Sequence, residues 1–358
     1  NYIQANKIVN FLKNRIKKHG FSFSDRVIVS VGNVPEFFLI KLALNTLGIS
    51  CVPLNKELSN KERSYIIEHS EAKLIICDKK EKKYFNTYSI ALFVYENNNF
   101  EIIKKPKTNN KVKKYIIKPS TESSLLYTSG TTGNPKGCIL SHEYEINAGF
   151  AYAIKKGLIS IRKRKEKIYN CLPVHHVNSG VLSFFAAMLS GNTQIQSKRF
   201  SSNLFWKEIK YSNATIFHYL GVMVPILLNR KITSIETDNQ LRLGIGAGIE
   251  PNLHEIFEKR FKIPMVELWG MTEMVRCIFD YKKSRKIGMR CFGKPDNNLE
   301  IKILKNNRKT NKNYVLGQLL IRHSKKSPRK GFFSGYLKNM IETENAWKNG
   351  WFHTGDIV

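Results

Sequence analysis

Short apolar segments alternate with amphipathic ones along the first third of the chain. Apolar residues recur at helical spacing between Ile3 and Ile16, and Gly20 ends this pattern. Ser59, with Glu62 three residues later, has the sequence of a helix N-cap. Strand and helix alternate, which predicts a parallel sheet of the α/β class. Helices are expected over residues 1–19, 35–47 and 59–70, and strands over residues 25–31, 50–54 and 74–77.

The α/β pattern resumes after a connection rich in Asn, Lys and Pro. This connection covers residues 96–123, and we expect one short strand in it, Tyr115–Ile117. After Gly288 the pattern changes to short β-like segments, which predicts a small antiparallel lobe. Strands are expected over residues 124–128, 167–172, 193–196, 216–219, 241–245 and 265–268, and in the last part over residues 299–304, 317–322 and 351–352.

Together these elements predict an α/β protein with two parallel-type β/α subdomains packed together and a small antiparallel β lobe. The predicted domains are residues 1–120, residues 121–287 and residues 288–358. The second of them contains the glycine-rich segments described below. The third ends at the motif around Asp356.

The composition is that of a globular protein. Hydrophobic residues make up 42% of the 358 residues, and no apolar run reaches the roughly 20 residues that a membrane helix needs. The six cysteines form no CxxC pair, and their spacing suits neither a disulfide framework nor a zinc site. No secretory segment is present at the start of the sequence. These features favour a reducing, cytoplasmic setting.

The formal net charge of +31 is the most unusual bulk property. A high positive charge can serve nucleic-acid binding, but the basic clusters here lie far apart in the sequence. No aromatic residues are interleaved with them in the manner of single-strand-binding proteins. We expect most of this charge to be solvated surface, with no specific nucleic-acid partner, although contact with another polyanion stays open. The clusters are Lys79–Lys83, Lys104–Lys114, Arg162–Lys167 and Arg322–Lys330.

The strongest local signal is the segment Tyr127–Gly137, which reads YTSGTTGNPKG and follows a predicted strand. Its glycines allow successive backbone N–H groups to converge on an anion. Its Ser and Thr hydroxyls add donors, and Lys136 adds a positive charge. The segment differs from a Walker A loop, because Pro135 stands where that pattern has its second Gly. We interpret it as a polyphosphate-binding loop, the alternative being a flexible surface turn.

In its order of residues this loop resembles the signature loop of the adenylate-forming superfamily, which includes acyl-CoA synthetases, firefly-type luciferases and peptide-synthetase adenylation domains. Other segments are similar to motifs of the same superfamily. Leu172–Asn178 resembles its Leu-Pro-Leu-Phe-His segment, with His176 at the histidine beside the acyl site. His175 stands where an aromatic residue is usual, and a His pair taken alone is more often structural.

The segment Gly244–Gly248 reads GIGAG and follows a strand. It is no Rossmann fingerprint, because Ile249 occupies the place of the last Gly. In the resemblance it matches the turn whose backbone packs against adenine; a plain strand-to-helix turn is the alternative. Glu267–Glu273 resembles the family's Tyr-Gly-Met-Thr-Glu motif, with Trp269 in place of Tyr.

Gly350–Asp356 is similar to the family's Gly-Trp-Phe/Leu-His-Thr-Gly-Asp segment, which places Asp356 on the ribose hydroxyls. The resemblance further implies that Thr272 holds the α-phosphate and that Glu273 offers an oxygen to Mg²⁺. Gln318, where Glu is usual, is a departure that concerns packing. The implied catalytic residues are Lys136, Thr272, Glu273 and His176, and the implied nucleotide-binding residues are Thr128, Ser129, Gly130, Thr131, Thr132, Gly133, Lys136, Gly246, Ala247, Gly248, Glu267, Trp269, Gly270, Met271, Thr272 and Asp356.

The family chemistry has two steps. A carboxylate attacks the α-phosphate of ATP to give acyl-AMP and pyrophosphate, and a thiol, usually coenzyme A, then takes the acyl group. The resemblance therefore implies a small carboxylic acid as substrate, with ATP, Mg²⁺ and coenzyme A as cofactors. The alternatives are a non-catalytic nucleotide-binding module and an adenylation domain that loads a carrier protein.

Three stretches resemble the carnitine/crotonobetaine-CoA ligase-like branch: Phe205–Trp206, His218–Gly221 and Gly246–Ile249. If this likeness extends to the substrate, a quaternary ammonium would contact aromatic faces such as Tyr219 or Trp269. The expected acyl-pocket walls are Val177–Ser183, Tyr219–Val222 and Gly246–Ile249.

In the family a C-terminal lid domain with a catalytic lysine follows the ribose motif. This sequence reaches Val358, two residues beyond Asp356, and contains no such domain. We expect the 358-residue chain alone to bind ATP or AMP but to form acyl-AMP far more slowly than a protein that carries the lid. Equal rates of acyl-AMP formation by the two would contradict this expectation.

Overall fold

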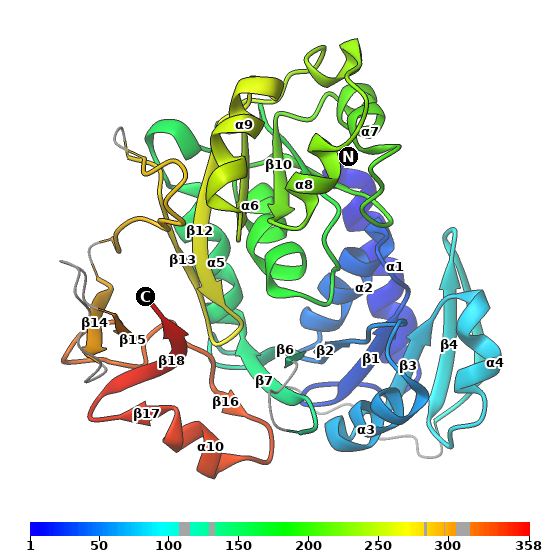
Figure 1. Cartoon of the computed structure of the whole chain (residues 1–358). Helices are drawn as coiled ribbons and strands as arrows, with labels where there is room; N and C mark the ends of the chain where they lie inside the picture. The colour runs from blue at the N-terminus through cyan, green and yellow to red at the C-terminus, as the bar shows by residue number, and fades with distance from the viewer. Residues whose placement is uncertain (107–114, 129–132, 283–284, 297, 306–315) are drawn as a thin grey trace.

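The computed structural model describes residues 1–106, 115–128, 133–282, 285–296, 298–305 and 316–358 (Figure 1). These residues form three sheets, with helices packed between and around the two larger ones, so the predicted α/β class with an additional antiparallel sheet is confirmed. Four predicted site residues, Ser129, Gly130, Thr131 and Thr132, lie outside the described residues. No described helix combines the length and apolar character that crossing a membrane requires.

The first sheet has eight strands in the order β16-β7-β6-β2-β1-β3-β4-β5, and its central strands run parallel. Strands β1, β2 and β3 are buried along almost their whole length, which explains why they read as continuous apolar runs. The strands are β1 Arg26–Ser30, β2 Ser50–Pro53, β3 Leu74–Cys77, β4 Ala91–Glu96, β5 Asn99–Lys104, β6 Glu122–Thr128, β7 Lys136–Ser141 and β16 Gly335–Tyr336.

Four helices cover the two faces of this sheet. The predicted N-cap at Ser59 is confirmed: its hydroxyl accepts the Glu62 N–H, and the Glu62 carboxylate accepts the Ser59 N–H. On one face lie α1 Tyr2–Lys18 and α2 Pro35–Asn45, and on the other α3 Asn60–Ser70, α4 Lys82–Phe85 and the 3₁₀ turn η1 Lys79–Glu81.

Two expectations for residues 96–123 are wrong. Asn97 and Asn98 both have positive φ, 50° and 62°, and form the turn of a hairpin that pairs β4 with β5. Asn tolerates this backbone geometry, and two-residue hairpin loops require it. The predicted strand Tyr115–Ile117 has no strand partner; Tyr115 instead stacks on Phe23, with ring centroids 4.6 Å apart.

The second sheet has six strands in the order β13-β12-β11-β10-β8-β9. Its central strands match the predicted ones, but β13 is absent from the sequence analysis, because it returns antiparallel to β12 directly after a tight turn. The strands are β8 Lys167–Asn170, β9 Thr193–Gln196, β10 Ile216–Leu220, β11 Leu243–Ala247, β12 Met265–Met271 and β13 Met274–Phe279.

Helices also cover both faces of the second sheet. One face packs on α5 His142–Ala153, on α6 Phe184–Leu189 and on the π-helical turn η3 Asn178–Ser183. The other face packs on α7 Phe205–Ser212, α8 Met223–Leu228 and α9 Pro251–Phe261. Two 3₁₀ turns complete this part, η2 Gly157–Ile159 and η4 Ser234–Glu236.

The third sheet is antiparallel, with the order β14-β15-β18-β17, as predicted for the part after Gly288. Its strands are β14 Glu300–Lys305, β15 Gly317–Arg322, β17 Trp347–Lys348 and β18 Trp351–Ile357, and α10 Met340–Asn345 precedes β17.

The first sheet itself extends across residue 120, where we predict a domain boundary. Strand β6 pairs with β2 through Cys51 and Ser124, and β7 continues the sheet beyond β6. The short strand β16 then adds to β7, so the sheet edge includes a segment some 200 residues further along the chain. The strands that flank the predicted phosphate loop therefore belong to the first sheet.

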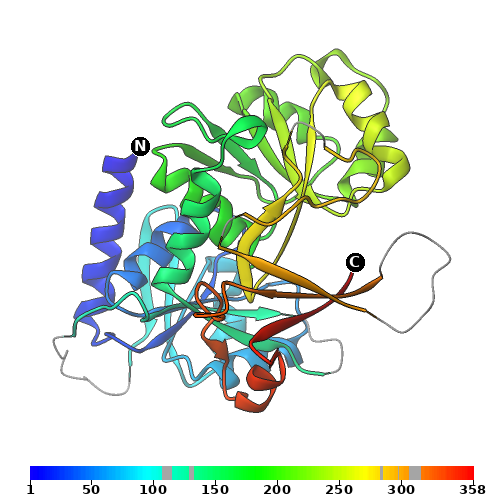
Figure 2. The same ribbon diagram turned by 90° about the vertical axis from the view of Figure 1, so that its left-hand side faces the viewer.

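A helical layer lies between the two larger sheets, with α2 beside α5 (Figures 1 and 2). Within it, Lys41 on α2 and Glu145 on α5 form an ion pair of 2.7 Å with side chains only 2% and 0% exposed. The Lys41 ammonium also donates to the hydroxyl of Ser124 on β6. Phe38 and Phe184 stack nearby, with ring centroids 4.3 Å apart. These contacts join the first sheet to the helices of the second.

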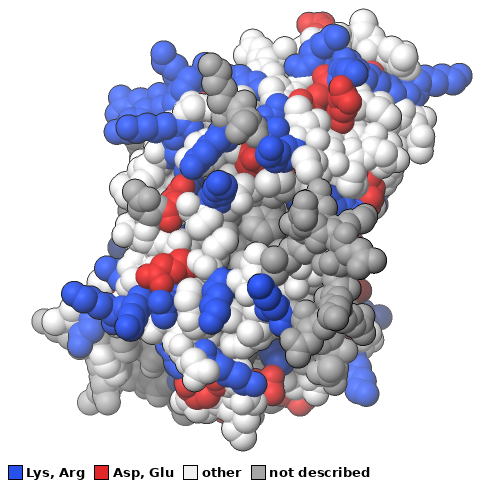
Figure 3. Space-filling view, turned by 60° about the vertical axis from the view of Figure 1, so that its left-hand side comes forward, with Lys and Arg blue, Asp and Glu red and all other residues white. Residues whose placement is uncertain are grey.

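The surface charge does not form one continuous stripe on the face shown in Figure 3. Lys and Arg side chains gather in the upper and the lower parts of that face, with other residues and some Asp and Glu side chains between them. This arrangement is consistent with the expectation of a broadly solvated positive surface, and the absence of a specific nucleic-acid partner stays a prediction.

Removing one member of the buried pair leaves the other charge without its partner in a water-poor layer. We predict that Lys41→Met or Glu145→Leu alone lowers the free energy of unfolding by about 3–5 kcal/mol, and that the double variant recovers most of this loss. Urea denaturation would measure the free energy of unfolding.

The exposed pair Lys259–Glu255, with side chains 73% and 65% exposed, is the matched control. There, Lys259→Met should cost less than about 1 kcal/mol. Single variants at the buried pair that are no worse than this control would refute the prediction.

Candidate nucleotide-binding site

The glycine-rich loop is held at both ends by a hairpin. Thr128 ends β6 and Lys136 begins β7, and the two residues are partners across this antiparallel pair. The Thr128 hydroxyl donates to the Lys136 carbonyl at 3.4 Å. Gly133, the first residue after the part of the loop that the structure leaves undescribed, is exposed. The two strands that flank the loop therefore belong to the first sheet, and the loop follows a strand, as expected from the sequence.

The side chain of Lys136 is fixed by two groups from the end of the chain. Its ammonium lies 2.7 Å from a carboxylate oxygen of Glu342 on α10 and 5.2 Å from the ring centroid of Tyr336 on β16. The hydrogen bond and charge of Lys136 lower the pKa of Glu342, so this carboxylate is anionic at neutral pH. Asn339 caps α10 by accepting the Glu342 N–H at 3.0 Å.

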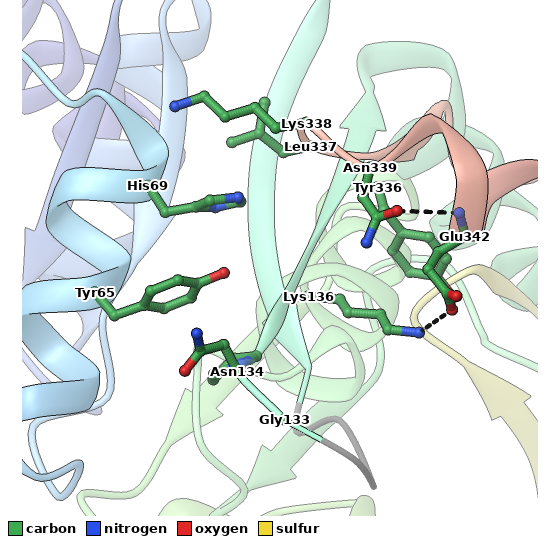
Figure 4. Close-up of a pocket in the computed structure, with 11 residues that line it drawn as sticks. Tyr65, His69, Gly133, Asn134, Lys136, Tyr336, Leu337, Lys338, Asn339 and Glu342 are labelled. Carbon is green, nitrogen blue, oxygen red and sulfur yellow. Dashed lines mark hydrogen bonds and ion pairs between the residues drawn. The ribbon is translucent and has the colours of Figure 1, made fainter.

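A pocket of about 320 Å³ lies beside the end of the loop (Figure 4). Tyr65 and His69 of α3 form one wall, and the segment that carries Lys338 and Glu342 faces them. Burial and the neighbouring Lys338 lower the pKa of His69, which keeps its ring neutral at pH 7. The lysine of the loop therefore lies at the edge of a polar, open cavity.

A second part of the site is the turn after β11, which is stabilised by hydrogen bonds to the buried side chain of Glu267. The Glu267 carboxylate accepts the N–H of Gly248 at 3.0 Å, the N–H of Ile249 at 3.1 Å and the hydroxyl of Tyr219 at 2.8 Å. Burial and the Glu267 charge raise the pKa of Tyr219, so its hydroxyl is the donor. Glu267 is only 6% exposed. Glu267 therefore stabilises the turn from its buried side. The backbone of Ala247 and Gly248 lies on the side of the turn that faces solvent.

Two glycines make this turn possible through close backbone approach. A Cβ at Gly246 would lie 2.2 Å from the carbonyl oxygen of Tyr219. A Cβ at Gly221 would lie 1.7 Å from the carbonyl oxygen of Gly248. Gly248 also has a φ of +82°, which side chains disfavour. The result is a smooth backbone surface of the kind that a flat ring can cover.

The structure contradicts one hypothesis about this region. Tyr219 is fully buried beneath the turn, with 0% exposure, so it cannot present its ring to a quaternary ammonium as the sequence analysis suggested. The reason is the close packing against Gly246, which brings the Tyr219 ring under the strand. Trp269 is partly exposed, and its role stays a prediction.

Trp269 and Asp356 come together from two different sheets. Trp269 lies near the end of β12 and donates its indole N–H to the Asp356 carboxylate at 2.7 Å. Asp356 is an exposed residue of β18 in the third sheet. Phe292 lies next to Trp269, with ring centroids 6.1 Å apart. A Cβ at Gly270, the next residue, would lie 2.7 Å from the Cys277 sulfur, so a side chain there would have to displace Cys277.

Thr272 and Glu273 form the turn between β12 and β13, after Met271. The Thr272 carbonyl accepts the Tyr144 hydroxyl at 2.6 Å, which ties the turn to α5. The Glu273 carboxylate, in a residue 7% exposed, accepts the Tyr336 hydroxyl at 2.6 Å. Among the described residues no group of three metal-ligating side chains exists. A lone carboxylate still fits Mg²⁺, which takes one or two carboxylates together with phosphate oxygens and water.

The predicted acyl-site histidine lies apart from these contacts. His176 is exposed, just before η3, and its ring centroid is 4.5 Å from that of His175. Burial, and next the charge of His176, lower the pKa of His175 to about 3, and partial desolvation by the surrounding protein lowers the pKa of His176, which keeps some exposed surface. Both rings are therefore neutral at pH 7.

Sequence reasoning missed two residues of this site, Tyr336 and Glu342. No motif in the sequence assigned a role to Tyr336. The Asn339-to-Glu342 spacing is a recognisable helix cap, yet its contact with Lys136 joins positions 206 residues apart. No local pattern reports such a contact.

Among curated proteins, the chain is 24% identical over 376 residues to a crotonobetaine/carnitine–CoA ligase from Proteus mirabilis, covering 99% of this chain and 71% of the relative. It is 28% identical over 355 residues to a 2-succinylbenzoate–CoA ligase from Bacillus licheniformis, covering 96% of this chain and 68% of the relative.

Solved structures show the same fold. An O-succinylbenzoate coenzyme A synthetase from Bacillus subtilis in complex with AMP matches with a TM-score of 0.79 and 21% identity, over 100% of this chain and 88% of the other. ATP-bound MatB from Rhodopseudomonas palustris matches with a TM-score of 0.79 and 18% identity, over 99% and 70%. A family model described as "AMP-binding enzyme" matches residues 1–337. The resemblance to the adenylate-forming superfamily is thus confirmed, and the chain belongs to the AMP-binding enzyme family.

Proposed function

We propose that this chain carries the nucleotide site of an AMP-forming acid–thiol ligase. The enzyme would join a carboxylate to ATP, giving acyl-AMP and pyrophosphate, and would then transfer the acyl group to the thiol of coenzyme A. The observation that carries this proposal is the meeting of residues from all three sheets. Lys136 and Glu273 converge on Tyr336, and Trp269, four residues before Glu273, bonds Asp356.

In this proposal the turn Gly246–Gly248 and the ring of Trp269 bind the adenine. The turn offers bare backbone and Trp269 a flat aromatic face, which suits stacking on a purine. One oxygen of Asp356 accepts the indole N–H, and the other would accept the ribose hydroxyls. Glu267 would contribute by keeping the turn in shape.

The phosphates would lie between the loop and the β12–β13 turn. Lys136 would contact the pyrophosphate with Thr128 and the rest of the loop, and Thr272 would hold the α-phosphate. For Ser129, Gly130, Thr131, Thr132 and Gly133 the phosphate contacts implied by the resemblance stay a prediction. Glu273 would hold Mg²⁺, which neutralises charge on the phosphates when bound.

The carboxylate substrate is already an anion, so the first step needs no strong base. Catalysis would consist of holding the carboxylate in line with the α-phosphate and stabilising the charge that develops there. Neutral His176 would lie beside the acyl group. Relatives are named for carnitine-type acids and for 2-succinylbenzoate, so these two acid classes are the first to test as substrates.

The first test is pyrophosphate release by the full-length gene product with ATP, Mg²⁺, coenzyme A and a panel of carboxylates that includes both classes. We expect release that depends on one acid, with formation of its thioester. Lys136→Met should lower the rate by about 10- to 100-fold, because one preorganised charge on the phosphates is lost. Lys338→Met removes another lysine of the same pocket, and it should change the rate by less than about twofold, since Lys338 pairs with exposed Glu71.

Equal rates for Lys136→Met and the wild type would contradict the assigned role of Lys136. Acid-dependent release of pyrophosphate without thioester would favour a carrier protein as the acceptor of the acyl group. No release with any acid, while ATP still binds, would count against the ligase.

The ribose contact can be tested by changing the ligand along with the protein. Asp356→Ala should weaken AMP binding about tenfold or more, because charge-assisted hydrogen bonds to the ribose are lost. Binding of 2′,3′-dideoxy-AMP, which lacks both hydroxyls, should be nearly the same in the variant and the wild type. Calorimetric titration would measure both affinities.

Trp269→Phe, which keeps an aromatic ring but removes the N–H to Asp356, is the control for the loss of that bond. An equal loss for both ligands would disprove a ribose contact.

A further inference from the structure

Tyr336 lies between the lysine of the phosphate loop and the carboxylate assigned to the metal. Its hydroxyl donates to a Glu273 carboxylate oxygen at 2.6 Å, and the Lys136 ammonium lies 5.2 Å from its ring centroid. The three side chains come from β16, the β12–β13 turn and β7, so they belong to three separate segments of the chain. One aromatic residue thus contacts both charged groups that the proposed function places on the phosphates.

The backbone on both sides of Tyr336 is fixed by hydrogen bonds to these same segments. Phe333 donates its N–H to the Glu273 carbonyl at 2.9 Å, and Leu337 donates its N–H to the Gly137 carbonyl at 2.8 Å. The Tyr336 N–H itself donates to the Thr343 hydroxyl at 2.9 Å. The ring therefore has little freedom to move away from Glu273.

The hydroxyl of Tyr336 is held as a donor. The phenol O–H donates its hydrogen bond to the Glu273 carboxylate, which can only accept. Glu273 has little exposed surface, and this bond directs one of its two oxygens toward the tyrosine. When a hydrogen bond fixes one oxygen of a carboxylate, the other oxygen points in a defined direction. Residues that hydrogen-bond to metal ligands orient those ligands in this way.

We infer that Tyr336 is a positioning residue that orients Glu273 for Mg²⁺ while its ring face supports Lys136, so that metal and phosphate contacts are set by one side chain. This inference rests on the proposed function, because it takes Glu273 as the metal carboxylate. The hydroxyl and the ring have separable roles: the hydroxyl acts on the metal through Glu273, and the ring acts on Lys136.

The experiment separates these roles by measuring ATP affinity in EDTA and in excess Mg²⁺, with calorimetry as a readout independent of turnover. Tyr336→Phe keeps the ring and removes the hydroxyl. It should leave the affinity in EDTA within about twofold, and it should reduce the Mg²⁺-dependent gain in affinity by about tenfold, the lower end of what loss of an outer partner costs. Tyr336→Leu removes the ring as well and should also weaken ATP binding in EDTA.

Tyr169→Phe is the matched control. The Tyr169 hydroxyl also donates to a glutamate, Glu208, at 2.6 Å, and Tyr169 is also largely buried, but it lies on β8 with no contact to the loop among the described hydrogen bonds. This variant should keep both affinities. Glu273→Gln should reduce the Mg²⁺-dependent gain on its own, and Tyr336→Phe added to it should cause little further loss, because the two act through one contact.

Two results would overturn the inference. If Tyr336→Phe keeps the wild-type gain from Mg²⁺, or loses affinity equally in EDTA and in Mg²⁺, the hydroxyl has no role specific to the metal. If Glu273→Gln keeps the wild-type gain, the assignment of Glu273 in the proposed function fails first, and the inference falls with it. The response of Glu273→Gln therefore distinguishes the two failures.

Discussion

A charge pair with almost no access to water holds the middle of this molecule together. Lys41 of α2 bonds Glu145 of α5 and, at the same time, Ser124 of β6, the strand that leads into the phosphate loop. Burying two charges is costly, and it is tolerated only where both are well paired. The pair therefore fixes the helical layer against the strand. Since α5 also bonds the β12–β13 turn through Tyr144, the same layer connects the loop to the opposite side of the site.

The site brings together turns from the first two sheets and Asp356 from strand β18 of the third sheet. Each turn is fixed by a contact that the ligand does not need: Glu267 holds the β11 turn, Tyr144 and Tyr336 hold the β12–β13 turn, and the Thr128–Lys136 pair holds the loop. Preorganisation of this kind keeps donors and charges in place before the reaction.

The sequence was sufficient to predict the sheets' central strands, the motif positions and the family, because these depend on local patterns and on a motif order that spans the chain. Strands β4, β5, β7 and β13 were missed; β5 and β13 each return antiparallel after a two-residue turn, which leaves no break in the sequence pattern long enough to mark a new strand. Tyr219 was misjudged because its burial follows from packing beneath Gly246. Tyr336 and Glu342 acquire their importance only through contacts with residues far away in the sequence, and such contacts leave no local pattern.

The measurement that tests the central claim most directly is a crystal structure of this protein with AMP. The account predicts adenine against the Gly246–Gly248 turn and Trp269, the ribose hydroxyls on Asp356, and the phosphate near Thr272, with Tyr336 still bonded to Glu273. AMP bound at another place, or at this place with the ribose turned away from Asp356, would contradict the account.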